Sequence, residues 1–449
     1  MAISCRPMAS EPRSALHRIF SNTGFLISSR IINALCSFAY VAWAVHALGL
    51  KTFGVLLLIT TFVTLVSDMT HLQSWQTLLH YGTAAFEARD RRRFMPVLGY
   101  CIRSDMISAA IGLVGGVIVI ALTGTHFLGW SDPVKRDASW MMLTVAFMNT
   151  GWSTGVIRLC NRFGLAALFD FGSTCVRTLG YLIGSLCHAP LEFFLFIWFL
   201  HQFALFALTS LGGLVLLRRH MGGDIRLVSS FLTPSETLGI WGFTLRVSVN
   251  QILDALFRQG GTLIIGAMLG ARDVAIYRVT KQICDGLAKP AQMMIPSLYP
   301  EFVRFRDNQN WSELRHVARR LALVIFGFSA LAVVVALFGG KAIVHLMLHD
   351  SFANEMPIIL LMVFSALLEV CIIPLETLLT VMGRLAIILK YRLAVIALYF
   401  AILAGLMALC GVTGAALASV ACSIMIFVIC LVLAARWISS RHAARYGEA

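Results

Sequence analysis

Charged and polar side chains recur at helical spacing inside apolar segments of this 449-residue chain. Arg246, Asn250, Asp254 and Arg258 follow one another at intervals of four, which places them on one face of a helix. The arginine side chain presents a planar fork that binds phosphate oxygens in a bidentate way. Because an ion inside an apolar span costs about 2.5 to 3.5 kcal/mol on insertion scales, we interpret these residues as candidates for function.

Three further segments carry such polar faces, and together the four define our candidate sites. The candidates for binding an anionic ligand and its polar attachments are Arg30, Asn33, Tyr40, Arg246, Asn250, Arg258, Lys281 and Lys289. The candidates for a proton or sodium site are Asp68, Asp254 and Asp285. In the segments that hold Arg30, Arg246 and Lys281, cations outnumber acids, so the ligand that they favour is anionic.

These residues also have structural interpretations. Arg103 and Arg278 lie near segment ends, where a long side chain reaches the membrane interface. Arg258 is one helical turn from Asp254, so an alternative role is to neutralise that acid. Arg30 has no acidic residue in its own segment, and a functional role is therefore favoured there. The three acidic candidates keep both interpretations open.

The elements that must position these residues are membrane spans. The chain is 59% hydrophobic and 13% charged, with a mean hydropathy of +0.82, which predicts an all-α polytopic membrane protein. Apolar runs long enough to cross a bilayer predict about twelve transmembrane helices. The expected spans are 20–47, 53–81, 97–123, 139–158, 168–187, 191–217, 237–268, 273–301, 319–339, 355–382, 388–409 and 412–436.

The distribution of Lys and Arg predicts the orientation of these spans. With both termini in the cytoplasm, the outer connections hold only Lys51, Lys135, Arg136, Arg272 and Lys341, and the inner ones hold most of the remainder. The net charge of +14 is mostly this bias. No basic run interleaved with aromatic residues indicates a nucleic-acid partner. The first nineteen residues contain no apolar run typical of a cleavable signal peptide.

Neither a metal nor a cofactor is expected. The eleven cysteines are scattered without a CxxC pair, and we interpret them as small apolar fillers. His345 and His349 are four residues apart, but only Asp350 lies nearby as a third ligand, so we interpret this stretch as an interfacial segment.

The chain also shows signs of an internal duplication. The stretch LGLKTFG at 48–54 is matched by LGARDVA at 269–275, and Arg162 matches Arg384 at nearly the same offset of about 221 residues. Six plus six spans then form two pseudo-symmetric lobes, 1–230 and 231–449, related by an axis along the membrane normal. In that arrangement a substrate lies between the lobes, and alternating access rocks one lobe against the other.

Four segments carry a family resemblance: ALGLKTFGVLLLI at 47–59, GGTLIIGAMLGARDVAIYRVTKQI at 260–283, PAQMMIPSLYPEF at 290–302 and GVTGAALASVACSIM at 411–425. They resemble the polysaccharide transporter family, the O-antigen and exopolysaccharide flippases of the multidrug, oligosaccharidyl-lipid and polysaccharide exporter superfamily. The resemblance implies a V-shaped twelve-helix bundle in a bacterial inner membrane. It further implies movement of an undecaprenyl-diphosphate-linked oligosaccharide between leaflets. It also admits polysaccharide polymerase or glycosyltransferase machinery as partners.

Two alternatives stay open. A multidrug and toxin extrusion (MATE) antiporter shares the superfamily, but exporting cations calls for acidic walls, and no acid lies in span 20–47. A membrane-embedded polysaccharide polymerase or ligase needs a large outer loop for its acceptor, and the expected outer connections are short. We therefore expect a non-enzymatic flippase in which Arg30 and Arg258 hold the diphosphate and Arg246 and Lys281 guide it in and out.

Overall fold

The computed structural model of the protein describes residues 12–125, 128–222, 239–292, 327, 356–381 and 385–446. Over these ranges the chain forms helices and no strand. It divides into two compact units, Met1–Leu263 and Ile264–Ala449. The lobe boundary expected near residue 230 stays a prediction. The expected span 319–339 lies almost wholly outside the described residues, as does the end of span 273–301.

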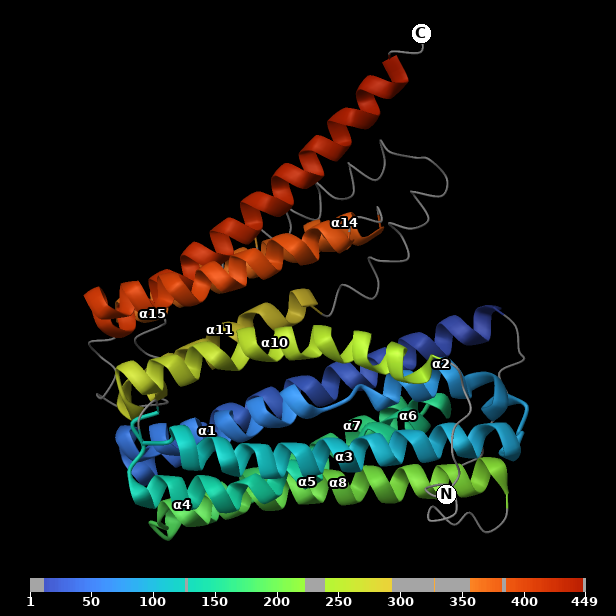
Figure 1. Ribbon diagram of the computed structural model, residues 1–449, viewed down its shortest axis with the longest axis horizontal. Helices are drawn as coiled ribbons and strands as arrows, with labels where there is room; N and C mark the ends of the chain where they lie inside the picture. The colour runs from blue at the N-terminus through green and yellow to red at the C-terminus, as the bar shows by residue number, and fades with distance from the viewer. Residues whose placement is uncertain are drawn as a thin grey trace. The chain divides into compact units, whose positions relative to one another are not determined.

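The first unit is a bundle whose long helices run alongside one another (Figure 1). Its elements are α1 Pro12–Thr70, α2 Ser74–Glu87, α3 Arg91–Thr123, α4 Asp132–Met141, the 3-10 helix η1 Met142–Thr144, α5 Val145–Met148, α6 Gly151–Leu159, α7 Phe163–Leu186, α8 Leu191–Met221 and most of α10 Ile240–Met268. α7 packs between α1 and α8, and α2 packs on α3 and α6. An apolar core under α2, α3 and α6 includes Leu78, Phe94, Leu98 and Val156, each fully buried.

The second unit contains α11 Ala271–Gln292, α14 Met356–Val381 and α15 Leu385–Tyr446 among its described elements. α14 lies along α15, and α11 packs against both (Figure 1). Two hydroxyl pairs join these helices: Tyr277 with Ser419 at 3.3 Å, and buried Ser365 with Ser423 at 2.9 Å. Such short polar contacts between helices are common in membrane proteins, where lipid offers no competing partner.

Five described segments are long and apolar enough to cross a membrane. Two of them, Ile32–Glu87 with 56 residues and Leu393–Ala434 with 42, far exceed the roughly 20 residues that one crossing needs. Each contains a glycine with left-handed backbone geometry, Gly49 at φ 69° and Gly411 at φ 61°. The multi-pass, all-helical class is confirmed, and the count of twelve stays a prediction.

The two matched Leu-Gly turns have the same local backbone feature. Gly49 interrupts α1 at φ 69°, and Gly270, at φ 97°, separates α10 from α11. Residues with a Cβ rarely adopt such values, so glycine is needed at both turns. This local agreement supports the predicted duplication, which itself stays a prediction.

The surface of α3 is typical of a helix in lipid. Its buried face consists largely of small residues at intervals of four, Ser104, Ser108, Gly112 and Gly116. Its other face is large and apolar but exposed, with residues Met106, Ile111, Val114, Ile118 and Leu122. Small residues let helices approach closely inside a membrane, while the apolar face contacts lipid tails.

Two expected spans are broken, which corrects the prediction of continuous helices over 53–81 and 139–158. The chain is non-helical at 71–73, between α1 and α2, and again at 149–150, between α5 and α6. The apolar composition continues through both breaks, because hydropathy does not depend on where the backbone hydrogen bonds of a helix end. Irregular backbone at membrane depth is stable only where other protein groups surround it or where it lines a cavity.

Candidate functional site

Several predicted site residues have side chains outside the described part of the structure. These are Arg30, Asn250, Asp254, Asp285 and Lys289, although each lies in a helix whose course is known. Their predicted roles stay predictions. The described candidates are Asn33, Tyr40, Asp68, Arg246, Arg258 and Lys281.

Two arginines of the α10 face reach the surface of the first unit. Arg246 is exposed and donates from Nε to the carbonyl of Gly242, one turn earlier, at 2.9 Å. Arg258 is exposed and lies within electrostatic range of Asp68 on α1. The structure therefore brings together a predicted ligand-binding cation and a predicted ion-coupling acid from two helices.

Asn33 and Tyr40 of α1 meet a polar face of α7. We call the resulting group the α1–α7 cluster; it consists of Asn33, Tyr40, Asp170, Arg177 and Tyr181. The Asn33 amide donates to the Asp170 carboxylate at 2.6 Å. The Arg177 guanidinium lies over the Tyr40 ring, 4.1 Å from its centroid, and 5.3 Å from that of Tyr181. Each such cation–π contact stabilises by about 0.5 to 2 kcal/mol, more when water is excluded.

The rings that hold Arg177 are themselves fixed by packing. Tyr40 and Tyr181 meet edge to face with centroids 5.5 Å apart, and Tyr181 makes a similar contact with Phe194 of α8 at 5.1 Å. Tyr181 is fully buried. On α8, His201 bonds through Nδ1 to the Ser173 carbonyl of α7 at 2.8 Å. The cluster thus sits where α1, α7 and α8 pack together.

A second set of polar residues lies at the two helix breaks. Asp105 of α3, only 4% exposed, accepts a hydrogen bond from Ser74 Oγ at 2.5 Å and another from the Trp152 N–H at 2.9 Å. Asn149 in the second break donates to the Asp105 carbonyl at 3.3 Å. One carboxylate therefore joins the first residue of α2 to the first turn of α6. An acid at a helix N-terminus is favoured by the helix dipole.

The first break also attaches α10 to the bundle. The Gln73 N–H donates to Ser248 Oγ at 3.1 Å, which satisfies a backbone group that the break leaves open. One turn away, Thr244 shares a 2.9 Å hydrogen bond with Thr77 and accepts another from the Tyr100 hydroxyl at 3.1 Å. α10 therefore has two polar faces side by side. One is the predicted face with Arg246 and Arg258, and the other, with Thr244 and Ser248, attaches the helix to α2 and α3.

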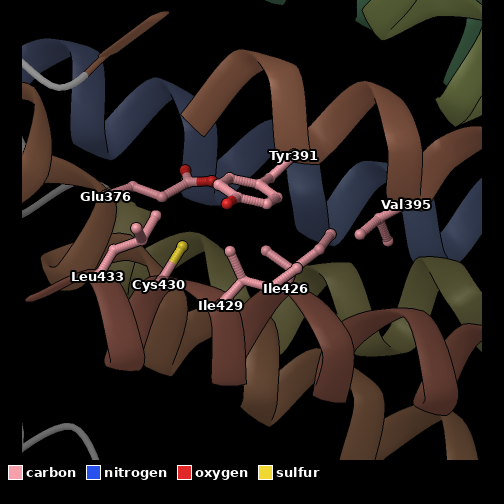
Figure 2. Close-up of a pocket in the computed structure, with 7 residues that line it drawn as sticks. All are labelled: Glu376, Tyr391, Val395, Ile426, Ile429, Cys430 and Leu433. Atoms are coloured by element: carbon pink, nitrogen blue, oxygen red, sulfur yellow. The ribbon is translucent and has the colours of Figure 1, made fainter. Parts of the chain in front are cut away.

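In the second unit, Arg278 and Lys281 of α11 are half-buried. A small pocket lies between α14 and α15, with about 10 Å³ of free space, roughly the room of one water. Figure 2 shows Glu376 and Tyr391 there among apolar side chains that include Ile426, Ile429 and Leu433. Glu376 was not among the predicted site residues.

Sequence reasoning missed Asp105, Asp170, Arg177 and Glu376 as site residues. A signal existed for each, because all four are charged residues inside expected spans. For α7 the signal was a stripe, because Asp170, Thr174 and Arg177 follow one another at steps of four and three. Among the described residues, no three of His, Cys, Asp and Glu gather as a metal site requires, and the pair His345 and His349 lies outside those residues.

Comparison with known proteins places this arrangement in a known fold. No protein family model matches the chain. The inner membrane protein YghQ of Escherichia coli strain K12 is 23% identical over 342 residues, covering 74% of this chain and 93% of that protein.

Solved structures cover nearly the whole chain. A multidrug resistance MATE family transporter of the MOP superfamily, in an inward-facing conformation, matches with a TM-score of 0.69 and 12% identity over 93% of this chain and 98% of its own. The lipid II flippase MurJ, in an inward closed conformation, matches with a TM-score of 0.62 and 12% identity, over 90% of this chain and 87% of its own. A MOP superfamily transporter from Pyrococcus furiosus, described as having a binding pocket of reverse polarity, matches with a TM-score of 0.56 and 13% identity. The match covers 96% of this chain and 97% of that protein. The chain therefore has the fold of MOP superfamily transporters.

Proposed function

We propose that this protein is a flippase that moves an undecaprenyl-diphosphate-linked oligosaccharide from the cytoplasmic to the outer leaflet of a bacterial inner membrane. The fold is shared with both a lipid flippase and drug exporters, so the fold alone does not select the substrate. The observation that carries the proposal is the excess of cations inside three expected spans, 20–47, 237–268 and 273–301. Away from their ends these spans hold two acids, Asp254 and Asp285, against six cations, Arg30, Arg246, Arg258, Arg278, Lys281 and Lys289.

Each part of such a substrate has a matching chemistry in the chain. The diphosphate carries about two negative charges, and we assign Arg30 and Arg258 to hold it through bidentate hydrogen bonds. Asn33, Asn250 and Tyr40 are assigned to form hydrogen bonds with the hydroxyl groups of the sugars. Because Arg258 lies within electrostatic range of Asp68, a bound diphosphate competes with that carboxylate for the same cation. Binding then weakens the attraction of Arg258 for the Asp68 carboxylate, which favours uptake of a proton or sodium ion.

Loss of the arginines tests the proposal. A unit charge pair 4 Å apart is worth about 4 kcal/mol at an effective dielectric near 20, so removing one Arg contact weakens diphosphate binding severely. We expect Arg30→Ala and Arg258→Ala to abolish polysaccharide export in a strain lacking the gene, with protein levels unchanged on a blot. Lys at either position restores only part of it, because the planar fork is lost.

Asp68→Asn and Asp254→Asn are the controls, since they remove candidate coupling acids and leave the cations in place. Slowed but measurable export by these two variants fits the proposal. Normal export by both alanine variants would instead make the arginines structural and remove the chemical support for a flippase.

A MATE-type antiporter is the second candidate, favoured by the likeness to that group of structures. An exporter of organic cations needs acids in its cleft, and Asp68 and Glu376 are acids within helices that the structure describes. Drug susceptibility separates the two candidates. If deleting the gene lowers resistance to cationic dyes and leaves polysaccharide export intact, the antiporter is the better assignment.

A further inference from the structure

Arg177 is a half-buried cation with a buried Nε, near the middle of the expected span 168–187. It lies in α7 Phe163–Leu186, about 14 Å along the axis from the C-terminal end and about 21 Å from the N-terminal end at 1.5 Å per residue. Tyr40 of α1 holds the guanidinium face, with 4.1 Å between the ring centroid and Cζ. Tyr181, one turn further along α7, contributes the second ring.

The guanidinium lacks the partners that a buried arginine normally has. Among the described residues no ion pair includes Arg177, and its Nε is buried without a hydrogen-bond partner. The hydroxyl of Tyr181 is also buried, and its contact with Arg177 lacks hydrogen-bond geometry. Cation–π contacts offset part of the charge, but they leave the buried Nε–H donor of the guanidinium unsatisfied.

The acids around this cation are few and engaged elsewhere. α7 contains Asp170, which lies seven residues away and accepts the Asn33 amide at 2.6 Å. α8 contains only Glu192, in its first turn and exposed. The part of α1 before the turn at Gly49 has no acidic residue. The three helices that surround Arg177 therefore supply no carboxylate dedicated to it.

We propose that Arg177 binds a phosphate oxygen of a membrane-borne lipid, donating from the guanidinium while Tyr40 and Tyr181 fix its plane. An oxyanion satisfies the open Nε–H donor and the charge together. The depth of the site favours a phosphate that arrives on a lipid. Asn33 and Asp170 then lie along the same face for hydroxyl groups attached beyond it.

The identity of that lipid rests on the proposed function: the diphosphate of a lipid-linked oligosaccharide supplies this chemistry, and so does the phosphodiester of an ordinary phospholipid. Both are tested with the full-length protein purified in detergent. The probes are undecaprenyl diphosphate and phosphatidylglycerol. The measurements are the dissociation constant by microscale thermophoresis and the melting temperature with and without the probe.

The variants are Arg177→Met, which keeps length without charge, Arg177→Lys and Arg93→Met. Arg93 is a matched control, because its side chain is 85% exposed at the N-terminal end of α3. We expect Arg177→Met to weaken probe binding by about tenfold or more, since a charge-assisted hydrogen bond is lost. Its melting temperature without probe should change little, because removal of an incompletely compensated charge offsets the loss of the two cation–π contacts. Arg177→Lys should be intermediate, and Arg93→Met should match the wild type.

The outcomes separate this inference from the proposed function. Binding of undecaprenyl diphosphate that is unchanged in Arg177→Met refutes the inference and leaves the flippase standing. Arg177-dependent binding of phosphatidylglycerol alone supports the inference and counts against the flippase. Binding of neither probe contradicts both. A lower melting temperature of Arg177→Met with unchanged affinity makes Arg177 a structural link between α1 and α7.

Discussion

Asp105 is a buried carboxylate that serves two helix beginnings at once. Ser74 Oγ and the Trp152 N–H both donate to it, at 2.5 and 2.9 Å. In Asp105→Asn the amide NH2 group faces one of these donors, which leaves a buried donor unsatisfied. We expect a loss of about 1 to 3 kcal/mol in stability, seen as a lower melting temperature of the purified protein in detergent.

Asp132→Asn is the matched control for that substitution. Its carboxylate is 90% exposed and accepts from Lys135 Nζ at 2.7 Å; this hydrogen bond, with the attraction of the ammonium, holds the pKa of Asp132 below its ordinary value. A carboxyl whose pKa is lowered on folding stabilises the folded state at pH values above its ordinary pKa. This stabilisation disappears as the pH falls through the lowered pKa. Because surface pairs contribute little, Asp132→Asn should melt like the wild type at neutral pH. Equal melting of Asp105→Asn and Asp132→Asn would show that the helix breaks do not depend on Asp105.

At the scale of elements, the packing of α3 depends on its small residues. A Cβ at Gly112 would lie 2.6 Å from Thr70 Oγ1 and 2.8 Å from Val145 Cγ1. Both neighbours are β-branched and rigid, so they cannot move aside cheaply. Gly115, three residues later, has nothing within 4 Å of its Cβ position. We expect Gly112→Ala to destabilise the protein by about 1 to 3 kcal/mol through overpacking.

Gly115→Ala should be neutral or stabilise by about 0.5 to 1 kcal/mol, because alanine is the better helix former. Thermal melting of the two variants in the same detergent compares them directly. If Gly112→Ala melts at or above the temperature of Gly115→Ala, α3 does not pack closely on α1 and α5.

The elements were predictable from the sequence where hydropathy decides them, and not where tertiary contacts do. The turn at Gly49 was expected, since glycine follows an apolar run and polar residues come next. The breaks at 71–73 and 149–150 were not, because they depend on Asp105 and Ser248 from other helices. Periodicity relates residues of one helix only. It therefore found Asn33 and Tyr40 but could not supply their partners on α7.

At the scale of the whole molecule, the charges at the two ends of the first unit differ. The His220 ring at the end of α8 stacks on Phe86 at 4.0 Å, which brings Arg218 and Arg219 toward the basic start of α3. Beyond the other end of α3 the cations are paired, Lys135 with Asp132 at 2.7 Å and Arg136 with Asp137 at 3.6 Å. At the start of α3, Arg93 pairs with Asp90 at 3.5 Å, but cations outnumber acids there. This end is the one that the positive-inside rule assigns to the cytoplasm.

This asymmetry predicts the labelling of two introduced cysteines. α3 has 33 residues and so spans about 50 Å, well beyond a hydrocarbon core of about 30 Å. Its start carries Arg92, while Lys135 packs near its end, with Cδ 3.0 Å from the Cβ position of Gly124. In a background without the eleven native cysteines, Lys135→Cys should react with an impermeant maleimide in intact cells. Arg92→Cys should react only in inside-out vesicles. The reverse pattern would invert the orientation, and labelling of both from one side would mean that α3 does not cross the membrane.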